Sequence, residues 1–321
     1  MNEIMPVPLL EARDVTKRFR AGGKRVVHAL EGVSLTVFAG ETLGVVGESG
    51  CGKSTLGRCL LRLYEPDAGT ILFQGHDITR MREGALRPLR AHMQMVFQDP
   101  YASLNPRRRI GDLLAEPLRV HRWGDEKAIA ARLVELMILV GLAPDHLSRY
   151  PHEFSGGQRQ RIGIARAIAL QPSLIIADEP VSALDVSIQA QIVNLLADLQ
   201  ARLDLTYVFV AHDLSVVRHI ADRVAVMYLG SIVEIGETDA VLHAPAHPYT
   251  AALISAVPEP DPDAQAVRTV LQGEPPSPID PPPGCRFHTR CPTAQARCSA
   301  ERPQLLPYGE GRSVACHFPL G

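Results

Sequence analysis

The sequence predicts an α/β fold built around a phosphate-binding loop, and three observations support this prediction. Residues 47–55, Gly-Glu-Ser-Gly-Cys-Gly-Lys-Ser-Thr, fit the pattern G-x-x-x-x-G-K-[ST] of loops that hold nucleotide phosphates. An apolar run at residues 43–46 precedes the loop and a helical periodicity at 53–63 follows it, so the loop joins a strand to a helix. The apolar runs 174–177 and 207–210 are typical of buried parallel strands.

Bulk properties agree with a folded globular protein. The chain has 321 residues, of which 46% are hydrophobic and 21% are charged. Its net charge of −2 gives no support for nucleic-acid binding. Residues 1–14 lack the basic-then-apolar layout of a signal peptide, and no apolar stretch approaches the length of a membrane span. We therefore expect a cytosolic protein whose cysteines stay reduced.

The N-terminal part predicts an antiparallel sheet. Residues 9–19 and 26–38 alternate apolar and polar side chains, as strands with one exposed face do. Residues 70–73 and 93–97 are further strand candidates on either side of a polar stretch.

A helical block follows a loop that is rich in helix breakers. The loop covers residues 99–106, and the helical pattern extends from 110 to 140 with Asp125 as a candidate N-cap. Because this block separates the phosphate loop from the later strands, we expect an inserted helical subdomain at about residues 100–170.

The second half continues with alternating helices and strands. A helix is predicted at 156–170, an amphipathic helix at 186–203, and a hairpin from strands 223–228 and 231–235. After about residue 244 the composition changes, because more than half of the 26 prolines lie there. Proline at that density predicts extended chain and turns, without helix or central strand.

The phosphate loop brings together the groups that bind a nucleoside triphosphate. Backbone N–H groups and the helix dipole favour phosphate oxygens, Lys53 is expected to reach the β- and γ-phosphates, and the Ser54 hydroxyl to bind Mg²⁺. A chance glycine turn would rarely show every fixed position between a strand and a helix. The predicted ATP-binding residues of this loop are Gly47, Ser49, Gly50, Cys51, Gly52, Lys53, Ser54 and Thr55.

Polar side chains follow three of the predicted strands. Asp178 and Glu179 stand at the carboxyl end of a central strand, where α/β proteins bind ligands. Asp178 is suited to hold Mg²⁺, and Glu179 to deprotonate the attacking water. His212 is placed to bond to the γ-phosphate, and Gln98 to lie near Mg²⁺ or the water. Without a phosphate loop nearby, the two carboxylates would be interpreted as a solvated acidic turn, and His212 and Gln98 as ordinary surface residues. Because the sequence also contains a phosphate loop, we interpret all four as catalytic.

A second anion-binding helix terminus is predicted about 100 residues after the first. A hydroxyl and two glycines open a helix and leave N–H groups free, as phosphate sites require. One γ-phosphate does not need two helix termini from one chain, so we infer that this segment meets a nucleotide on a partner subunit. Its residues are Ser155, Gly156, Gly157 and Gln158.

Together these motifs resemble the ATP-binding cassette (ABC) ATPases, in the same order, over about residues 8–250. The similar segments are the Walker A motif at 47–55, the Q-loop at Gln98, the signature at 155–158, the Walker B motif at 174–179, the D-loop at 182–185 and the switch histidine at His212. The resemblance covers a nucleotide-binding domain at 8–250, followed by a Pro- and Cys-rich extension at 251–321.

The resemblance implies a RecA-like P-loop NTPase core with an antiparallel β-subdomain and an inserted helical subdomain. It implies that two cassettes close head-to-tail over two ATP molecules, with residues 155–158 and Asp185 acting in trans. Phe19 resembles the aromatic residue that stacks on adenine, although tyrosine is commoner there. Phe154 likewise stands where leucine is commoner.

Three further segments, 97–106, 186–191 and 247–250, resemble the ATPases of oligopeptide and dipeptide importers. Val181 and residues 214–217 are more similar to the second of the two ATPases that such importers carry. This implies a related ATPase as partner, with a homodimer as the alternative, two transmembrane permease subunits and, indirectly, an extracytoplasmic peptide-binding protein. The chain would then lie peripherally on the cytoplasmic face of the inner membrane.

Other functions were weighed against peptide import. Nickel and glutathione importers share these patterns, so the cargo rests on analogy. A non-transport cassette acting on nucleic acid or ribosomes is the alternative from another class. It would be expected to carry a coiled-coil or zinc-hook insertion, or two cassettes in one chain, and the sequence shows neither.

Four of the six cysteines crowd the C-terminal end with the spacing C-x5-C-x6-C-x17-C: Cys285, Cys291, Cys298 and Cys316. In a reducing compartment such a group suggests a metal before disulfides. Zinc usually shows tighter pairs, whereas iron–sulfur clusters allow wider spacing. The resemblance to the importer subfamily implies a [4Fe–4S] cluster here, with Zn²⁺ or unligated thiols as alternatives.

Overall fold

The structure is a computed structural model that describes residues 7–23, 25–99, 104–256 and 273–321. The chain divides into two compact units. The first is built mainly from Met81–Val210 together with Phe38–Glu41. The second is built from Pro8–Val37, Thr42–Arg80 and Ala211–Gly321. The phosphate loop and the C-terminal extension therefore belong to the same unit.

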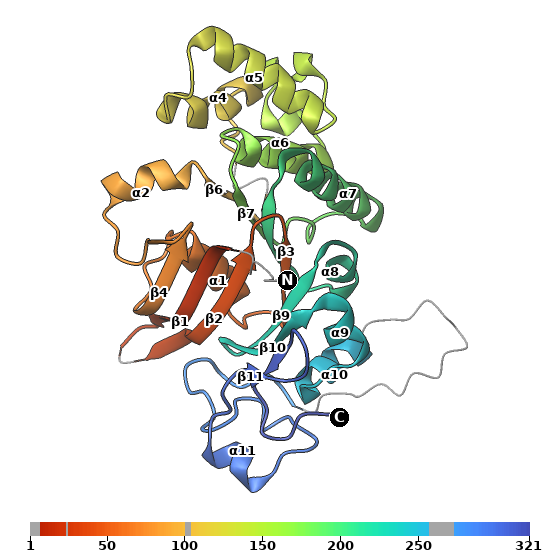
Figure 1. The fold of residues 1–321 in the computed structure, drawn as a ribbon. Helices are drawn as coiled ribbons and strands as arrows, with labels where there is room; N and C mark the ends of the chain where they lie inside the picture. Colours follow the sequence, from red (N-terminus) through yellow and green to blue (C-terminus); the bar gives the residue numbers. More distant parts are fainter. Residues whose placement is uncertain (1–6, 24, 100–103, 257–272) are drawn as a thin grey trace, which may run out of the picture. The chain divides into compact units, whose positions relative to one another are not determined.

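The predicted antiparallel sheet is present in the second unit, with strand order β2-β1-β4-β5 (Figure 1). Apolar residues of β1 such as Leu10 and Val15 are buried and alternate in part with exposed ones, which confirms the half-exposed strand pattern. A bulge near Asp14 shifts the register between β1 and β4. The strands are β1 (Pro8–Arg20), β2 (Val26–Phe38), β4 (Ala68–Phe73) and β5 (His76–Asp77).

A second set of strands in this unit carries the phosphate loop. The buried strand β3 (Thr42–Val46) pairs in parallel with β9 (Arg223–Tyr228), which pairs antiparallel with β10 (Ser231–Glu237). The predicted hairpin turn is confirmed at Leu229 and Gly230, which both have positive φ, as a tight turn between twisted strands requires.

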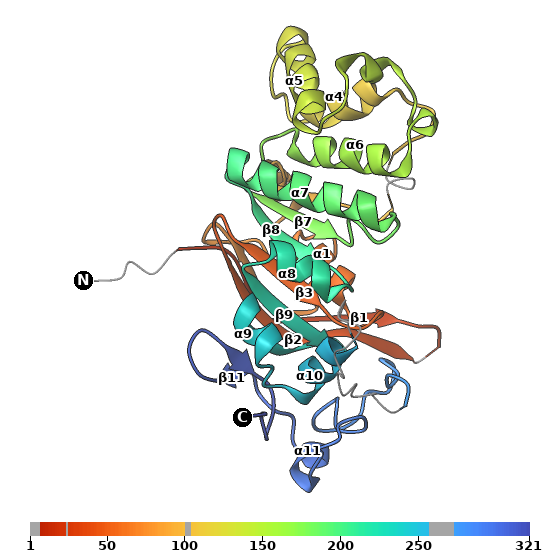
Figure 2. The same cartoon turned by 90° about the vertical axis from the view of Figure 1, so that its right-hand side faces the viewer.

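Five helices and two short strands complete the described part of the second unit (Figure 2). Helix α1 directly follows the phosphate loop, as predicted. The other elements lie in the C-terminal third of the chain. They are α1 (Lys53–Leu60), α8 (Leu214–Ile220), α9 (Thr238–His243), α10 (Pro248–Ser255), α11 (Ala296–Ala300) and the strand pair β11 (Leu306–Pro307) and β12 (Ser313–Val314).

The prediction that the proline-rich tail contains no helix is wrong for the short helix α11 and for α10. Pro248 is the first residue of that helix, where a missing N–H costs nothing, and the side chain of His247 caps it by accepting from the N–H of Tyr249. The tail also adds β12 to the edge of β10 through Glu234 and Ile235. Residues 257–272 of the tail, and residues 100–103 of the importer-like loop, lie outside the described residues.

The first unit has three parallel strands in the order β8-β7-β6. These are β6 (Met93–Val96), β7 (Leu174–Asp178) and β8 (Thr206–Val210), and the residues of β7 and β8 are all buried, as their apolar runs predicted. Parallel strands with buried faces confirm the α/β class.

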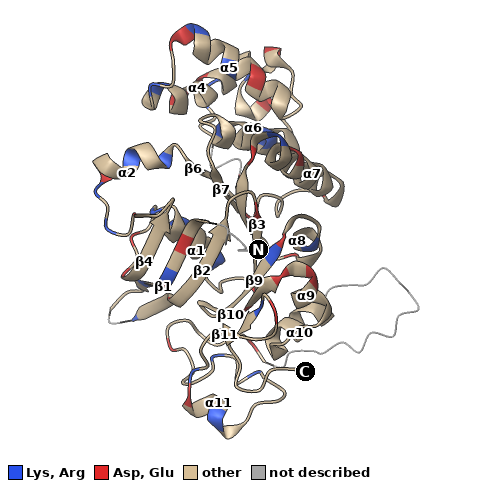
Figure 3. Ribbon diagram, viewed as in Figure 1, with Lys and Arg blue, Asp and Glu red and all other residues tan. Residues whose placement is uncertain are grey.

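Helices make up the rest of the first unit, with α4, α5 and α6 packed together (Figures 1 and 2). Asp125 caps α5 by accepting from the N–H of Ala128, as predicted. Basic and acidic residues are interspersed along these helices (Figure 3). The helices are α2 (Glu83–Arg90), α4 (Ile110–Val120), α5 (Glu126–Leu139), η1 (Pro144–Ser148), η2 (Pro151–Glu153), α6 (Gly156–Ile168) and α7 (Val186–Leu203).

None of the helices described in either unit combines the length and the apolar character needed to cross a bilayer. The domain division at residue 250 stays a prediction, because the second unit contains residues from both sides of it.

Candidate nucleotide site

Two glycines of the phosphate loop stand where a side chain cannot fit. Gly47 has φ 151° and a Cβ there would overlap the carbonyl oxygen of Met227 on β9. Gly52 has φ 107° and a Cβ there would overlap the carbonyl oxygen of Ala29 on β2. The loop is thus threaded between two strands, and only glycine allows that close approach.

Lys53 is buried at the first position of α1. Its Nζ donates to the carbonyl oxygens of Gly47 at 2.8 Å and Glu48 at 3.0 Å. The ammonium group therefore lies inside the curve of the loop, where a phosphate-binding lysine is expected. Ser54 and Thr55 are half-buried in the same first turn of the helix.

Three contacts from distant parts of the second unit brace the loop. The N–H of Gly230, in the hairpin turn, donates to the carbonyl of Cys51 at 2.8 Å. The N–H of Glu48 donates to the hydroxyl of Tyr249 at 2.9 Å. The guanidinium of Arg290 pairs with the Glu48 carboxylate at 2.8 Å. The loop is therefore supported by α10 and by the C-terminal extension as well as by its own strand and helix.

Phe19, at the end of β1, is half-buried in the same unit. Its ring meets the edge of Tyr64, with ring centroids 5.4 Å apart and an angle of 74° between the planes. The Lys17 Nζ lies 5.4 Å from the centroid of Phe19. Tyr64 escaped the sequence analysis, although its ring packs against that of Phe19.

His212 also belongs to the second unit, where it is exposed just before α8. The next residue, Asp213, caps α8 by accepting from the N–H of Ser215 at 2.8 Å. This cap fixes the start of α8 and, with it, the backbone that carries His212.

Gln98 and Glu179 meet in the first unit, a contact that the sequence analysis did not predict. The Gln98 Nε2 donates to the Glu179 Oε2 at 2.7 Å. Glu179 has φ 44°, a left-handed conformation that is unfavourable for a side chain of this kind. Bonds from the Glu179 N–H to Val210 and from Ser182 to the Glu179 carbonyl hold it there. Asp178, at the end of β7, is 1% exposed.

The predicted signature segment forms the N-terminus of α6, also in the first unit. Ser155 and Gln158 form a capping box, in which the Ser155 hydroxyl accepts from the N–H of Gln158 and the Gln158 side chain accepts from the N–H of Ser155. A Cβ on Gly157 would lie 2.6 Å from the Ile188 side chain of α7. Asp185, the N-cap residue of α7, is exposed.

The structure thus forms two groups from the predicted residues. The second unit carries the whole phosphate loop with Phe19 and His212, and the first carries Gln98, Asp178, Glu179, Asp185 and the signature segment. Within the first unit, a direct side-chain hydrogen bond joins Gln98 to Glu179.

The four C-terminal cysteines line one small cavity together with His247 and Phe287. Burial, with a smaller contribution from the neighbouring thiols, raises the pKa of Cys285 to about 11. Among the described residues, no three His, Cys, Asp or Glu side chains are arranged to hold a metal ion. The four thiols therefore lie around one cavity, but the described residues give no direct support for either the iron–sulfur cluster or the Zn²⁺ expected from the sequence.

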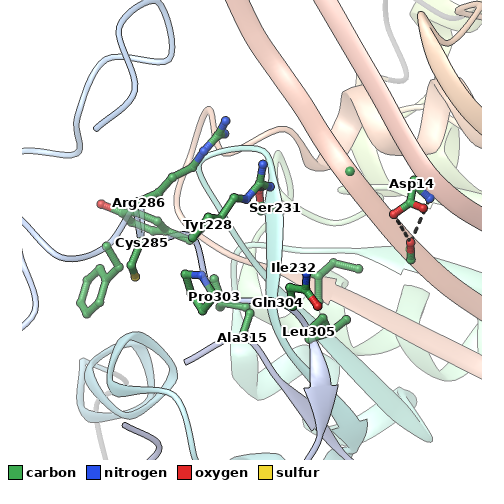
Figure 4. Close-up of a pocket in the computed structure, with 15 residues that line it drawn as sticks. Asp14, Tyr228, Ser231, Ile232, Cys285, Arg286, Pro303, Gln304, Leu305 and Ala315 are labelled. Atoms are coloured by element: carbon green, nitrogen blue, oxygen red, sulfur yellow. Dashed lines mark hydrogen bonds between the residues drawn. The ribbon is translucent and has the colours of Figure 1, made fainter. Parts of the chain in front are cut away.

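A larger cavity of about 570 Å³ lies where the extension meets the β9–β10 hairpin (Figure 4). Arg286 and Arg302 line it, and Arg302 donates to the Ser231 hydroxyl at 2.8 Å. Burial, followed by the charge of Arg302, lowers the pKa of Arg286 to about 10. The bond between Arg302 and Ser231 joins the extension to the hairpin at this cavity.

Sequence analysis missed the contacts that Glu48 of the loop makes with Tyr249 and Arg290. The segment 247–250 resembles importer ATPases, but no pattern in the neighbouring residues indicates that the Tyr249 hydroxyl reaches the loop. Arg290 carries no motif of its own beyond its position next to Cys291.

Comparison with known proteins shows similarity over nearly the whole chain. Residues 30–182 match the ABC transporter family, and residues 233–298 match the C-terminal region of oligopeptide/dipeptide transporters. The oligopeptide transport ATP-binding protein AppF of Bacillus subtilis is 53% identical, over 97% of this chain and 97% of that protein. OppF of Escherichia coli, of the same description, is 55% identical over 91% of this chain and 88% of that protein.

Among solved structures, a dimer of the ATP-binding cassette MJ0796 in a post-hydrolysis state with ADP and Pi is similar, with a TM-score of 0.66. It is 28% identical and covers 71% of this chain and 98% of its own. This similarity confirms the predicted P-loop NTPase fold.

Proposed function

The chain belongs to the ABC transporter family of ATPases, and from this membership we propose that it is the ATP-hydrolysing subunit of an importer of di- and oligopeptides. The observation that carries the proposal is the match of residues 233–298 to the C-terminal region of oligopeptide/dipeptide transporters, beside a phosphate loop with every fixed position present. The relatives AppF and OppF, both described as oligopeptide transport ATP-binding proteins, support the same cargo class.

In this proposal the second unit binds the nucleotide. Lys53, which already lies inside the loop, contacts the β- and γ-phosphates. The backbone N–H groups of residues 49–55 donate hydrogen bonds to the phosphate oxygens. Phe19 stacks on adenine. Ser54, Gln98 and Asp178 are the residues that would hold Mg²⁺, which would supply positive charge to neutralise the phosphates.

The first unit supplies the base. Glu179 accepts a proton from the attacking water, and the 2.7 Å bond from Gln98 orients its carboxylate for that task. From the second unit, His212 donates a hydrogen bond to the γ-phosphate. The residues Ser155, Gly156, Gly157, Gln158 and Asp185 meet the nucleotide of a second cassette; the dimeric state of the similar MJ0796 structure supports this arrangement.

The partners follow from the importer assignment. We propose a related ATPase as the second cassette, two transmembrane permease subunits, and a peptide-binding protein on the other side of the membrane. The chain would lie on the cytoplasmic face as a peripheral subunit.

Peptide uptake in a deletion strain tests the cargo. A strain that lacks this gene is expected to lose uptake of labelled di- and oligopeptides, and the wild-type gene is expected to restore it, whereas Glu179→Gln is not. Uptake of nickel and of glutathione is measured in the same strains. Unchanged peptide uptake with lost nickel or glutathione uptake would reassign the cargo, and unchanged uptake of all three would contradict an import role.

We also propose that Cys285, Cys291, Cys298 and Cys316 hold a [4Fe–4S] cluster, since all four line one cavity. When bound, such a cluster would cross-link the extension; the thiols would have to lose their protons, against the raised pKa of Cys285. Protein purified without oxygen is expected to be brown and to contain iron and acid-labile sulfide. Cys298→Ser should remove both, whereas Cys59→Ser, in α1, should not. Colourless anaerobic protein with zinc, or without metal, would contradict the cluster.

A further inference from the structure

The C-terminal extension is joined to the phosphate loop by one buried ion pair. The two terminal nitrogens of Arg290 contact the two carboxylate oxygens of Glu48 at 2.8 and 3.1 Å. The Arg290 side chain is 7% exposed and that of Glu48 is 25% exposed. A two-point contact of this kind fixes orientation as well as distance, and its partial burial makes it stronger than a surface pair.

Arg290 is itself held in place by an aromatic cluster. The backbone N–H of Arg290 donates to the carbonyl of Phe287 at 2.9 Å, and its guanidinium lies 6.0 Å from the ring centroid of Tyr228. The rings of Tyr228, Tyr249 and Phe287 contact one another, with centroids 4.7 to 5.4 Å apart. The backbone and guanidinium of Arg290 are therefore held against packed aromatic rings, so the side chain gains little conformational freedom if the ion pair breaks.

Glu48 is consequently held at three points. Its N–H donates to Tyr249, its carbonyl accepts from Lys53, and its side chain pairs with Arg290. The first and third of these partners come from α10 and the extension, outside the strand–loop–helix unit. Because Glu48 directly follows Gly47, fixing its two peptide groups sets the direction in which the loop curves around Lys53.

We propose that Arg290 is a positioning residue that holds the phosphate loop in the shape that binds ATP. The inference rests on the proposed role of the loop. A loop that is already ordered loses less entropy when the ligand binds, so the pair contributes to nucleotide affinity without touching the nucleotide. The extension thereby sets the ATP affinity of the cassette.

A double-mutant cycle on the full-length chain tests this. The variants are Arg290→Ala, Glu48→Ala and both together, with Arg290→Lys as the conservative change. Arg297→Ala is the matched control, since Arg297 lies in the same extension and pairs with the exposed Glu301, four residues further along the chain. The dissociation constant of a fluorescent ATP analogue and the thermal midpoint are measured for each.

Arg290→Ala is expected to weaken binding about tenfold, Glu48→Ala by a similar factor, and the double variant no more than either alone, because the two act through one contact. Arg290→Lys should fall between wild type and Arg290→Ala, since a single ammonium cannot make the two-point contact. Arg297→Ala should bind as wild type. A variant that is only less stable would have a lowered thermal midpoint and a smaller folded fraction, but its folded molecules would bind the analogue with the wild-type dissociation constant. A changed dissociation constant therefore distinguishes a positioning role from a purely structural one.

Unchanged affinity in Arg290→Ala, or effects that multiply in the double variant, would overturn the inference while leaving the proposed function intact. A wild-type chain that does not bind the analogue would overturn both. If Arg290→Ala does not fold, Arg290→Lys and Glu48→Gln decide: weaker binding in both supports positioning, and wild-type affinity in both contradicts it.

Discussion

Glu179→Gln is expected to slow ATP hydrolysis by about 10²–10⁴-fold, the usual contribution of a general base. Glutamine has nearly the same size and can still contact Gln98, but it cannot accept a proton from water. The phosphate loop lies in the other unit and is unchanged, so ATP should bind with wild-type affinity. With binding intact and hydrolysis blocked, the ATP-bound dimer should accumulate. Phosphate release and size-exclusion chromatography with ATP, in the presence of the partner cassette, measure both effects.

The control for this change is Glu126→Gln. Glu126 is an exposed residue of α5 that pairs with Arg119 at 2.7 Å and lies far from any motif in the sequence. Its replacement should leave turnover and dimer formation unchanged. Wild-type turnover in Glu179→Gln would show that Glu179 is not the general base and that another group accepts the proton from water.

Lys53→Ala is expected to reduce ATP affinity by at least about 100-fold and to bring hydrolysis to background, because two effects add. The proposed contact with the β- and γ-phosphates is lost, and hydrogen bonds to charged donors are worth about 1.5–3 kcal/mol each. In addition, the carbonyls of Gly47 and Glu48 lose their buried donor, so the loop itself loses support. Equilibrium binding of a fluorescent ATP analogue measures the first effect, and thermal unfolding with and without ATP measures the second.

Lys127→Ala, on the exposed surface of α5, is the matched lysine control and should bind ATP as wild type does. If Lys53→Ala keeps its affinity while it remains folded, residues 47–55 are not the main phosphate site and the proposed function fails at its first step.

Local patterns predicted most of the fold. The bounds of α7 agree with the predicted 186–203, and β2 agrees with 26–38, because periodicity and turn residues act within a few positions of each other. The N-cap at Asp125 and the hairpin turn at Leu229 and Gly230 are likewise decided by neighbouring residues.

The tail was harder to predict for the same reason. Composition describes an average over a segment, whereas α10 depends on the position of one proline, Pro248, and on a cap from His247. Strand β12 is only two residues long and exists because the edge of β10 offers it a partner. Neither feature has a periodic signal that sequence analysis could detect.

The sequence by itself determined the chemistry of this protein: a glycine-rich loop with a lysine and a hydroxyl, carboxylates after a buried strand, and a second helix terminus that opens with Ser-Gly-Gly. These signals are local, because each motif needs only a few adjacent residues. Only the tertiary structure decided what supports the loop. Glu48 meets Tyr249 and Arg290 at sequence separations of 201 and 242 residues, and such contacts arise from packing and leave no pattern in the chain.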